Sequence, residues 1–290
     1  MEQPLFTGVC TALVTPFLNL EVNYPLLQQL IRRQIASGIE AIVLCGTTGE
    51  APTLSDEEKL QLIRCGKDYA GAHCKIIAGT GSNDTLHAVK LSLQAQAQGA
   101  DAILVVAPYY NKGTETGLIR HFFAIADAIN IPMILYNVPS RTGLDIPVRV
   151  YKELSKHPNI AGVKEAGTDI TKITKIRLNC PEHFTVWTGN DNMTVPAMAL
   201  GATGVISVVS NVWPKRMKAM TTAALKGDYS TAAKLQYSMD QLQDLMFTET
   251  NPVPVKAAMK YLGFDCGSCR LPLAEATEET ENKLYAFFQT

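Results

Sequence analysis

The sequence has few charged residues, only 18%, and a formal net charge of −1 at pH 7. This balance gives no electrostatic reason for the chain to bind nucleic acid or an anionic membrane. The sequence also lacks any run of about 18 apolar residues, so no membrane-spanning helix is expected. Its first residues, Met1–Phe6, do not resemble a signal peptide. We therefore expect a cytoplasmic protein.

Signatures of metal and nucleotide cofactors are also missing. Gly79-Thr-Gly81 begins like a dinucleotide fingerprint, but the third glycine is absent. The seven cysteines are an odd number scattered through apolar segments, which fits reduced thiols, and Cys266 and Cys269 are expected at the surface. We expect neither a metal nor a cofactor. The histidines show no metal-ligand spacing along the chain; they are His73, His87, His121, His157 and His183.

Apolar residues are plentiful, 47%, and they gather in short runs between longer helical stretches. The runs lack strict polar alternation, so both faces of a parallel sheet are expected to be covered. Their starts lie roughly 20 to 35 residues apart, the length of a strand and its return helix. The pattern predicts a (β/α)8 barrel, with an open doubly wound sheet as the alternative. The predicted strands are Gly8–Thr15, Ala41–Cys45, Lys75–Ala78, Ala102–Ala107, Pro132–Tyr136, Ile160–Lys164, Phe184–Thr188 and Gly204–Val209.

Several helix ends have clear signals. Ser55 and Glu58 form the pattern of a capping box. Asn23 is expected to cap the helix that begins after it, and Gly38 and Gly99 are expected to end helices.

A barrel formed by residues 1–225 leaves residues 226–290 as a helical C-terminal domain. We expect this extension to pack on the barrel or against another subunit. Lys256 lies on it, where a lysine is far more often solvated than functional. Apolar residues recur in the extension at helical spacing; they are Ala232, Leu235, Met239, Leu242 and Met246.

Catalytic groups of a barrel project from the C-terminal ends of its strands. Lys164 ends an apolar run, where desolvation lowers the pKa of an ammonium and frees an amine to form a Schiff base. Tyr136 ends the preceding strand, and a phenol can transfer the protons that imine chemistry requires. Glu165 faces the other way on its strand and is expected to be a structural partner.

Two further positions offer binding groups for carboxylates. Thr47 and Thr48 lie in a glycine-flanked turn with hydroxyl and exposed N–H groups. Arg141 supplies a forked, permanently charged group for a second carboxylate. The set suits a 2-oxo acid held as a Schiff base, together with a second carboxylated substrate.

In combination, these motifs resemble the dihydrodipicolinate synthase branch of the N-acetylneuraminate lyase superfamily. The resemblance implies a (β/α)8 barrel with a C-terminal helical domain, assembled as a homotetramer of tight dimers. It also implies condensation of pyruvate with L-aspartate 4-semialdehyde to 4-hydroxy-tetrahydrodipicolinate, on the route to diaminopimelate and lysine. The motifs are GTTGE (46–50), PYYNK (108–112), YNVPSRTG (136–143), GVKEA (162–166) and NPVPVK (251–256).

The resemblance assigns catalytic roles by matching position. Lys164 forms the imine with pyruvate, and Tyr136 is the nearby acid and base. Thr47 links Tyr136 to Tyr110 of the neighbouring subunit in a proton relay. These roles are implied by the resemblance alone.

Binding roles follow in the same way. Thr48 and the backbone of the threonine pair hold the pyruvate carboxylate, and Arg141 receives the carboxylate of the semialdehyde. Gly189 and the Ile206 carbonyl complete the pocket wall.

Two other functions stay open at this point. A pyruvate-dependent sugar-acid aldolase shares the lysine and tyrosine, and Arg141 is the residue that favours the synthase. A catalytically silent barrel that senses a 2-oxo acid is the third reading, against which the complete residue set argues.

One departure from the resemblance concerns feedback by L-lysine. Family members that lysine inhibits bind it at the dimer interface, and Asn83 and Tyr109 match that allosteric site. His87, however, stands where a glutamate would pair with the ligand ammonium, and Lys59 replaces a histidine. Because two cations would repel a cationic ligand, weak or absent inhibition is predicted.

Overall fold

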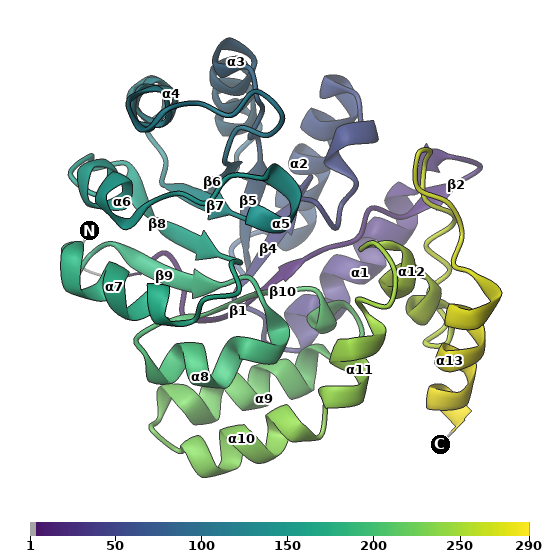
Figure 1. Cartoon of the computed structure of the whole chain (residues 1–290). Helices are drawn as coiled ribbons and strands as arrows, with labels where there is room; N and C mark the ends of the chain where they lie inside the picture. Colours follow the sequence, from purple (N-terminus) through teal and green to yellow (C-terminus); the bar gives the residue numbers. More distant parts are fainter. Residues whose placement is uncertain (1–3, 290) are drawn as a thin grey trace.

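The computed structural model describes residues 4–289. Eight parallel strands close into a barrel in the order β1-β10-β9-β8-β7-β6-β5-β4 (Figure 1). The predicted (β/α)8 barrel is therefore confirmed, and the open doubly wound sheet is wrong. The strands are β1 (Gly8–Ala12), β4 (Ala41–Leu44), β5 (Lys75–Gly79), β6 (Ala102–Val106), β7 (Met133–Asn137), β8 (Ile160–Glu165), β9 (Thr185–Thr188) and β10 (Gly204–Ser207).

Helices surround the barrel. Short helical segments and a two-stranded ribbon, β2 (Phe17–Leu18) with β3 (Glu21–Val22), lie in its loops. The short segments are η1 (Ala51–Thr53), α5 (Pro139–Thr142), η2 (Asp191–Met193) and η3 (Val209–Asn211). The outer helices are α1 (Tyr24–Ala36), α2 (Asp56–Ala70), α3 (Thr85–Ala97), α4 (Glu115–Ala128), α6 (Val148–Leu154), α7 (Thr171–Asn179), α8 (Thr194–Ala199) and α9 (Pro214–Leu225).

The predicted helix ends are confirmed. The Asn23 side chain accepts from the Leu26 N–H at 3.1 Å, and both hydrogen bonds of the capping box at Ser55 are present. Gly38 and Gly99 follow α1 and α3 with φ angles of 75° and 89°, a conformation that favours glycine.

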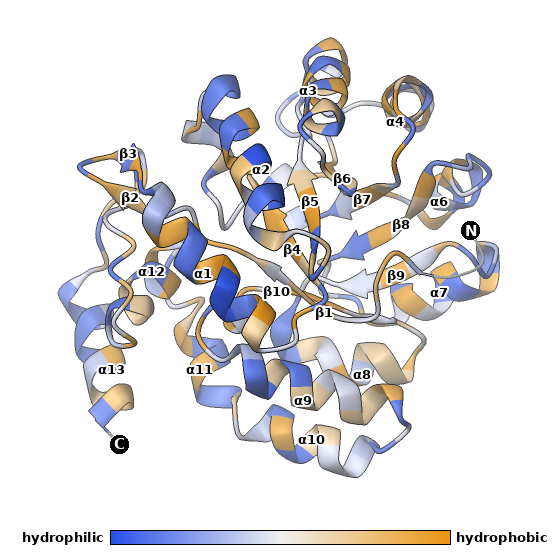
Figure 2. Cartoon of the chain, turned by 180° about the vertical axis from the view of Figure 1, so that it is seen from behind, coloured by the Kyte–Doolittle hydropathy of each residue, from blue (hydrophilic) through white to orange (hydrophobic). Residues whose placement is uncertain are grey.

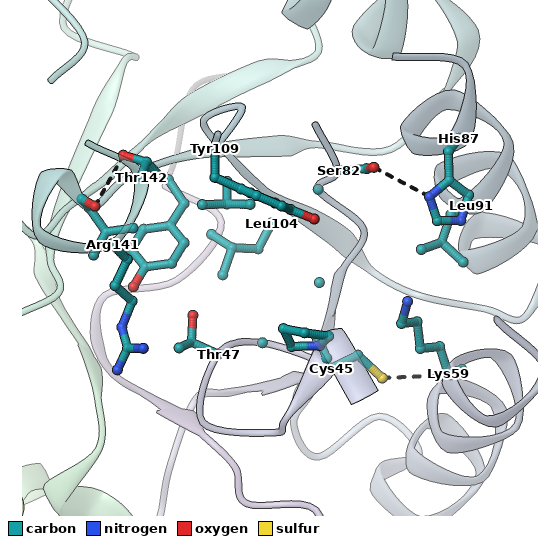
Figure 3. Close-up of a pocket in the computed structure, with 18 residues that line it drawn as sticks. Cys45, Thr47, Lys59, Ser82, His87, Leu91, Leu104, Tyr109, Arg141 and Thr142 are labelled. Atoms are coloured by element: carbon teal, nitrogen blue, oxygen red, sulfur yellow. Dashed lines mark hydrogen bonds between the residues drawn. The ribbon is translucent and has the colours of Figure 1, made fainter. Parts of the chain in front are cut away.

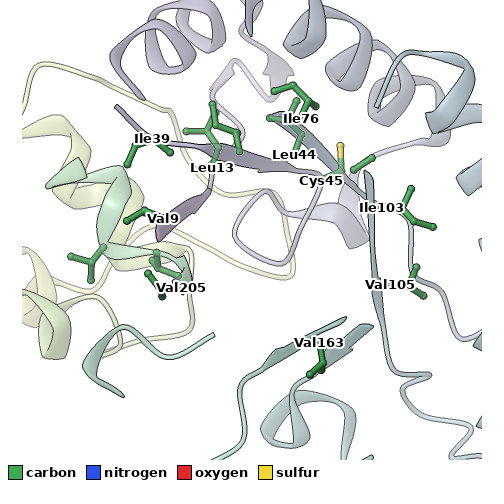
Figure 4. Close-up of a cluster of buried hydrophobic side chains, with 14 of the residues drawn as sticks. Val9, Leu13, Ile39, Leu44, Cys45, Ile76, Ile103, Val105, Val163 and Val205 are labelled. Atoms are coloured by element: carbon green, nitrogen blue, oxygen red, sulfur yellow. The ribbon is translucent and has the colours of Figure 1, made fainter. Parts of the chain in front are cut away.

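Two apolar layers hold the barrel together. Strand side chains that face outward pack under the helices, as Figure 4 shows for Val9, Leu44 and Ile103. The helices in turn carry apolar residues on one side and polar residues on the other (Figure 2). Inside the barrel, the Phe6 and Trp187 rings stack with centroids 4.9 Å apart and close the end where the strands begin. Catalytic groups are thus left to the opposite end.

The extension contains α10 (Tyr229–Tyr237), α11 (Asp240–Leu245), α12 (Val253–Lys260) and α13 (Glu278–Gln289). It packs on the barrel, with α10 against α8 and α9, and α12 against η3. The predicted apolar stripe is largely buried, although the helix is interrupted between α10 and α11. The division at residue 225 stays a prediction. Within residues 4–289, no helix has the length and apolar character needed to cross a membrane.

Two expectations about the extension are wrong. Cys266 and Cys269 are free thiols but are buried rather than at the surface, and burial raises the pKa of each to about 12. Lys256 is only 3% exposed. The cause is the same in both cases: the chain around Cys266 hydrogen-bonds to Phe17 in the loop after β1, which covers this side of the extension.

Candidate active site

A cavity of about 440 Å³ opens where β4, β5, β6 and β7 end (Figure 3). Its wall joins residues predicted for catalysis with residues predicted for regulation, although the two sets are distant in the sequence. The predicted residues that line it are Thr47, Lys59, His87, Tyr109, Tyr136 and Arg141.

Lys164 and Tyr136 lie side by side on β8 and β7, where the strand register pairs them. The ammonium nitrogen of Lys164 is 4.2 Å from the centre of the Tyr136 ring. Lys164 is 6% exposed and Tyr136 is 7% exposed, and Lys164 is not itself on the cavity wall. Among the described residues, Lys164 makes no hydrogen bond and no direct ion pair, and the acid that interacts with it at longer range is the buried Asp191, whose pKa burial raises and Lys164 acts to lower. A buried, unpaired amine is costly, and such groups concentrate at functional sites.

Gly189 gives the Lys164 side chain its space. A Cβ at this position would lie 2.9 Å from Cε of Lys164 and 2.7 Å from Cβ of Ala166. Ile206 is fully buried inside the barrel, in the same apolar cluster as Tyr136. Both residues predicted for the pocket wall therefore face the region of the paired lysine and tyrosine.

The GTTGE turn presents unused donors. The N–H groups of Gly49 and Glu50 are bonded inside the turn, at 3.1 Å each. Those of Thr47 and Thr48 donate to no acceptor in the part of the chain that the structure describes. Two consecutive free N–H groups form a small concave site that suits an anion such as a carboxylate.

Asn251, at the start of the NPVPVK motif, connects two of the predicted binding residues. Its side-chain NH2 group donates to the Thr48 hydroxyl oxygen at 3.0 Å. Its backbone carbonyl accepts from the Arg141 guanidinium at 3.2 Å. Asn251 and Thr48 are buried, whereas Arg141 is exposed at the rim. Sequence reasoning did not single out Asn251, although its motif was part of the resemblance.

Tyr110 is apart from the other predicted catalytic groups. Its side chain is 92% exposed and lies outside the cavity wall. Its φ angle of 67° is left-handed, which is uncommon for a residue with a large side chain. Thr47 and Tyr136 share the cavity, but within one chain the described structure does not extend a hydrogen-bonded relay to Tyr110.

Glu165 is a structural partner, as predicted. Its buried carboxylate accepts from Asn137 Nδ2 at 2.7 Å, the Gly167 N–H at 2.8 Å and the Tyr151 hydroxyl at 3.1 Å. Lys172, which is also buried, lies 3.4 Å from the same carboxylate. Burial and the Glu165 charge raise the pKa of Tyr151, so it remains a hydrogen-bond donor.

The predicted regulatory residues surround an acid that sequence reasoning missed. Asp56 lies 2.9 Å from His87 Nε2 and 3.5 Å from Lys59 Nζ. Burial acts to raise the pKa of Asp56, but the His87 hydrogen bond and the neighbouring His87 and Lys59 side chains outweigh it and lower the pKa. Tyr109 is on the cavity wall, whereas Asn83 is not. The two basic residues are therefore partly neutralised.

The fold and site together define a class: a (β/α)8 barrel with a buried lysine amine and a turn with two free N–H groups at its open end. The chain belongs to the dihydrodipicolinate synthetase family, whose family model matches residues 5–290. Among the residues that the structure describes, no group of three or more His, Cys, Asp or Glu side chains is placed to hold a metal ion.

Curated relatives and solved structures agree with this family. The 4-hydroxy-tetrahydrodipicolinate synthase of Acetivibrio thermocellus is 48% identical over 279 residues, which cover 96% of this chain and 95% of that enzyme. The crystal structure of dihydrodipicolinate synthase from Aquifex aeolicus is 44% identical, with a TM-score of 0.96 and coverage of 98% and 97%. The structure of DHDPS from Cyanidioschyzon merolae with lysine bound is 36% identical, with a TM-score of 0.95 and coverage of 98% and 97%.

Proposed function

We infer that this chain condenses pyruvate with L-aspartate 4-semialdehyde to give 4-hydroxy-tetrahydrodipicolinate. The relatives named above carry that activity in their name. The observation that carries the inference is the amine of Lys164, buried without a direct ion pair, 4.2 Å from the Tyr136 ring. No cofactor is needed, because a lysine imine by itself supplies the electron sink for the reaction.

In the proposed mechanism, the Lys164 amine attacks the pyruvate carbonyl, and loss of water gives the imine. The positive imine acidifies the adjacent methyl group, so loss of a proton gives an enamine that attacks the aldehyde. The amine of the second substrate then displaces Lys164 and closes the ring. Tyr136 is the acid and base for these transfers, since it lies beside the reacting nitrogen.

The two substrate carboxylates bind to different residues of the site. The free N–H groups of Thr47 and Thr48 receive pyruvate, together with the Thr48 hydroxyl. Because Asn251 donates to that hydroxyl oxygen, the Thr48 O–H is left to donate to the substrate. Arg141 at the rim receives the carboxylate of the semialdehyde, and Gly189 and Ile206 complete the wall.

We propose that Tyr110 completes the site of a neighbouring copy, in a homotetramer of tight dimers. Its exposed ring and left-handed backbone support this role, because strain of this kind persists where function requires it. Mixing Lys164→Met protein with Tyr110→Phe protein provides a test. Activity that returns on mixing means that Tyr110 acts across subunits, whereas no return places it in its own subunit.

L-Lysine is proposed to inhibit weakly through the surface of Lys59, His87, Tyr109 and Asn83. The free state of all seven cysteines supports action in the reducing cytoplasm.

The test of the function is borohydride reduction with pyruvate, followed by peptide mass spectrometry and by assays with two acceptors. A reduced pyruvyl adduct on Lys164 and turnover with aspartate semialdehyde are expected. Turnover with N-acetylmannosamine instead would identify a sugar-acid aldolase. A folded protein without any adduct would contradict the mechanism.

A further inference from the structure

Glu50, the last residue of the GTTGE turn, has a buried carboxylate that the proposed chemistry does not use. Its side chain is 0% exposed, and its φ angle of 56° is left-handed. Cys45, just before the turn, is also left-handed, at 57°. The turn that presents the free N–H groups of Thr47 and Thr48 therefore lies between two strained residues, and the surrounding structure has to hold them.

Both oxygens of the Glu50 carboxylate are held by the C-terminal extension. Lys256 Nζ on α12 is 2.8 Å from Oε1, and the Arg270 N–H donates to Oε2 at 2.9 Å. Lys256 also donates to the Ser268 carbonyl at 3.2 Å and lies 4.3 Å from the centre of the Phe17 ring. Lys256 is thus enclosed on several sides, and its position fixes that of Glu50.

Further contacts join the same two parts of the chain. Asn251 donates to Thr48, inside the turn. Arg270 donates to the Thr53 carbonyl at 2.9 Å and to Glu58 Oε2 at 2.8 Å, just after the turn. Figure 1 shows the loop between α12 and α13 beside the purple β2 strand, and Arg270 in this loop donates to the Leu20 carbonyl at 3.0 Å. The extension therefore holds the turn from within and from its far end.

We propose that Glu50 and Lys256 are positioning residues for pyruvate, and that the C-terminal extension braces the turn through them. Neither residue is assigned a contact with the substrate. The buried pair keeps the two free N–H groups at the spacing that a carboxylate needs, and their displacement weakens the hydrogen bonds that hold pyruvate. This proposal rests on the proposed function, because it assumes that the turn binds pyruvate.

The experiment measures the pyruvate concentration that half-saturates borohydride trapping on Lys164, in Lys256→Met and Glu50→Gln proteins. We expect this concentration, and the KM for pyruvate, to rise at least about tenfold, because hydrogen bonds to a charged group are weakened. The KM for the aldehyde is expected to change less than about threefold, because Arg141 keeps its place. The Glu50→Gln/Lys256→Met double variant removes both charges. Its loss of pyruvate affinity, as a free energy, is therefore expected to be smaller than the sum of the losses in the two single variants.

Two further variants keep the result interpretable. Lys67→Met is the matched control, since it breaks the 2.8 Å pair with Asp101 near the start of β5, at the other end of the barrel. It is expected to leave the KM for pyruvate unchanged. Asn251→Ala removes the contact with Thr48 without leaving a buried charge, so it decides the matter if the charge variants do not fold. Its pyruvate KM is expected to rise several-fold.

The outcomes distinguish failure of the proposed brace from failure of the proposed function. Unchanged half-saturation in folded Lys256→Met or Asn251→Ala protein would overturn the brace, as would equal rises in the KM of both substrates. An absence of adduct in the unsubstituted protein would instead remove the proposed function, whatever the variants do.

Discussion

Three lysines are buried within residues 4–289, and they differ in their partners. Lys172 pairs with Asp145 and lies 3.4 Å from Glu165, and Lys256 lies 2.8 Å from Glu50. Lys164 is as buried as Lys172, at 6% exposure, yet no carboxylate forms a direct ion pair with it, and the buried Asp191 acts on it only at longer range. Burial by itself therefore does not distinguish the proposed nucleophile from the other two lysines. The absence of a direct ion pair does.

The geometry of β8 creates this difference. Lys164 and Glu165 are neighbours in the strand, so their side chains point to opposite faces. Lys164 enters the barrel, where Tyr136 and Gly189 surround it. Glu165 points outward and forms an ion pair with Lys172. The nearest acid in the sequence is thus kept away from the reactive amine by strand alternation.

The largest effect is expected from removing the unpaired lysine. Lys164→Met should lower kcat/KM by at least about 10³-fold, because no other amine replaces the nucleophile. The free energy of unfolding should stay the same or rise by about 1 kcal/mol, since a buried polar group without a hydrogen-bond partner is lost. Steady-state kinetics and urea unfolding measure both quantities.

Lys75→Met is the control for that variant. Lys75 is exposed at the start of β5, away from the open end, so neither activity nor stability should change appreciably. If Lys164→Met protein is clearly less stable than the parent, the amine has a structural partner, and the contrast among the three lysines fails.

A loss of stability is expected instead from breaking a pair. Lys172→Met leaves the Glu165 carboxylate buried with only neutral donors, which should lower the free energy of unfolding by about 3 kcal/mol. Glu165→Gln/Lys172→Met should recover part of this, because no buried charge remains. Urea unfolding gives the values, and a double variant no more stable than Lys172→Met would show that the charges are not coupled.

The same contrast explains what could be predicted from the sequence. Lys164 and Tyr136 were found because each ends an apolar strand, and strand ends meet at the site of a barrel. The role of Lys256 was missed because its partner, Glu50, is 206 positions away. The contact of Asp56 with His87 was missed for the same reason, because the sequence alone does not say which side chains meet across α2 and α3. Its contact with Lys59, three residues away on α2, is the local part of the cluster.

The fold was more predictable than the site, since periodic apolar runs are local signals. Each strand of the barrel overlaps its predicted run. The β2–β3 ribbon was missed because its strands have only two residues each, too few for any periodicity. The interruption between α10 and α11 was missed because Met239 is buried there and continues the apolar spacing across the break.

His121 extends the comparison to a second buried base without an ion pair among the described residues. Its Nδ1 is 2.9 Å from the Thr85 hydroxyl, and burial lowers its pKa to about 4 despite the nearby Asp84 charge. In the unfolded chain His121 therefore becomes protonated near pH 6.5, whereas in the folded chain it stays neutral until the pH approaches 4. The free energy of unfolding consequently falls as the pH drops from 6.5 towards 4.

Between pH 7 and pH 5, this residue should cost the folded protein about 2 kcal/mol of stability. His121→Gln protein should lack that part of the pH dependence, since glutamine does not titrate. Urea unfolding of both proteins at the two pH values gives the difference directly. Identical losses in the two proteins would mean that His121 takes up its proton without unfolding.

The smallest expected effect is that of added L-lysine on the reaction rate. It concerns the residue Lys59, which already pairs with Asp56. Lys59 lines the cavity, and Asp56, the acid beside it, is shared with His87. A ligand ammonium would have to displace both of these bases from the carboxylate. Millimolar L-lysine should therefore change the initial rate by less than about twofold.

His87→Glu should increase the inhibition by L-lysine, because it introduces a carboxylate that can pair with the ammonium group of the ligand. His87→Gln is the control, since it removes the imidazole without adding a charge and should leave inhibition weak. Strong inhibition of the unsubstituted enzyme would mean that Asp56 exchanges Lys59 and His87 for the ligand. In that event a lysine residue with an ion-pair partner, such as Lys59, could also take part in ligand binding. The contrast between paired lysines and Lys164 would then apply only to residues inside the barrel.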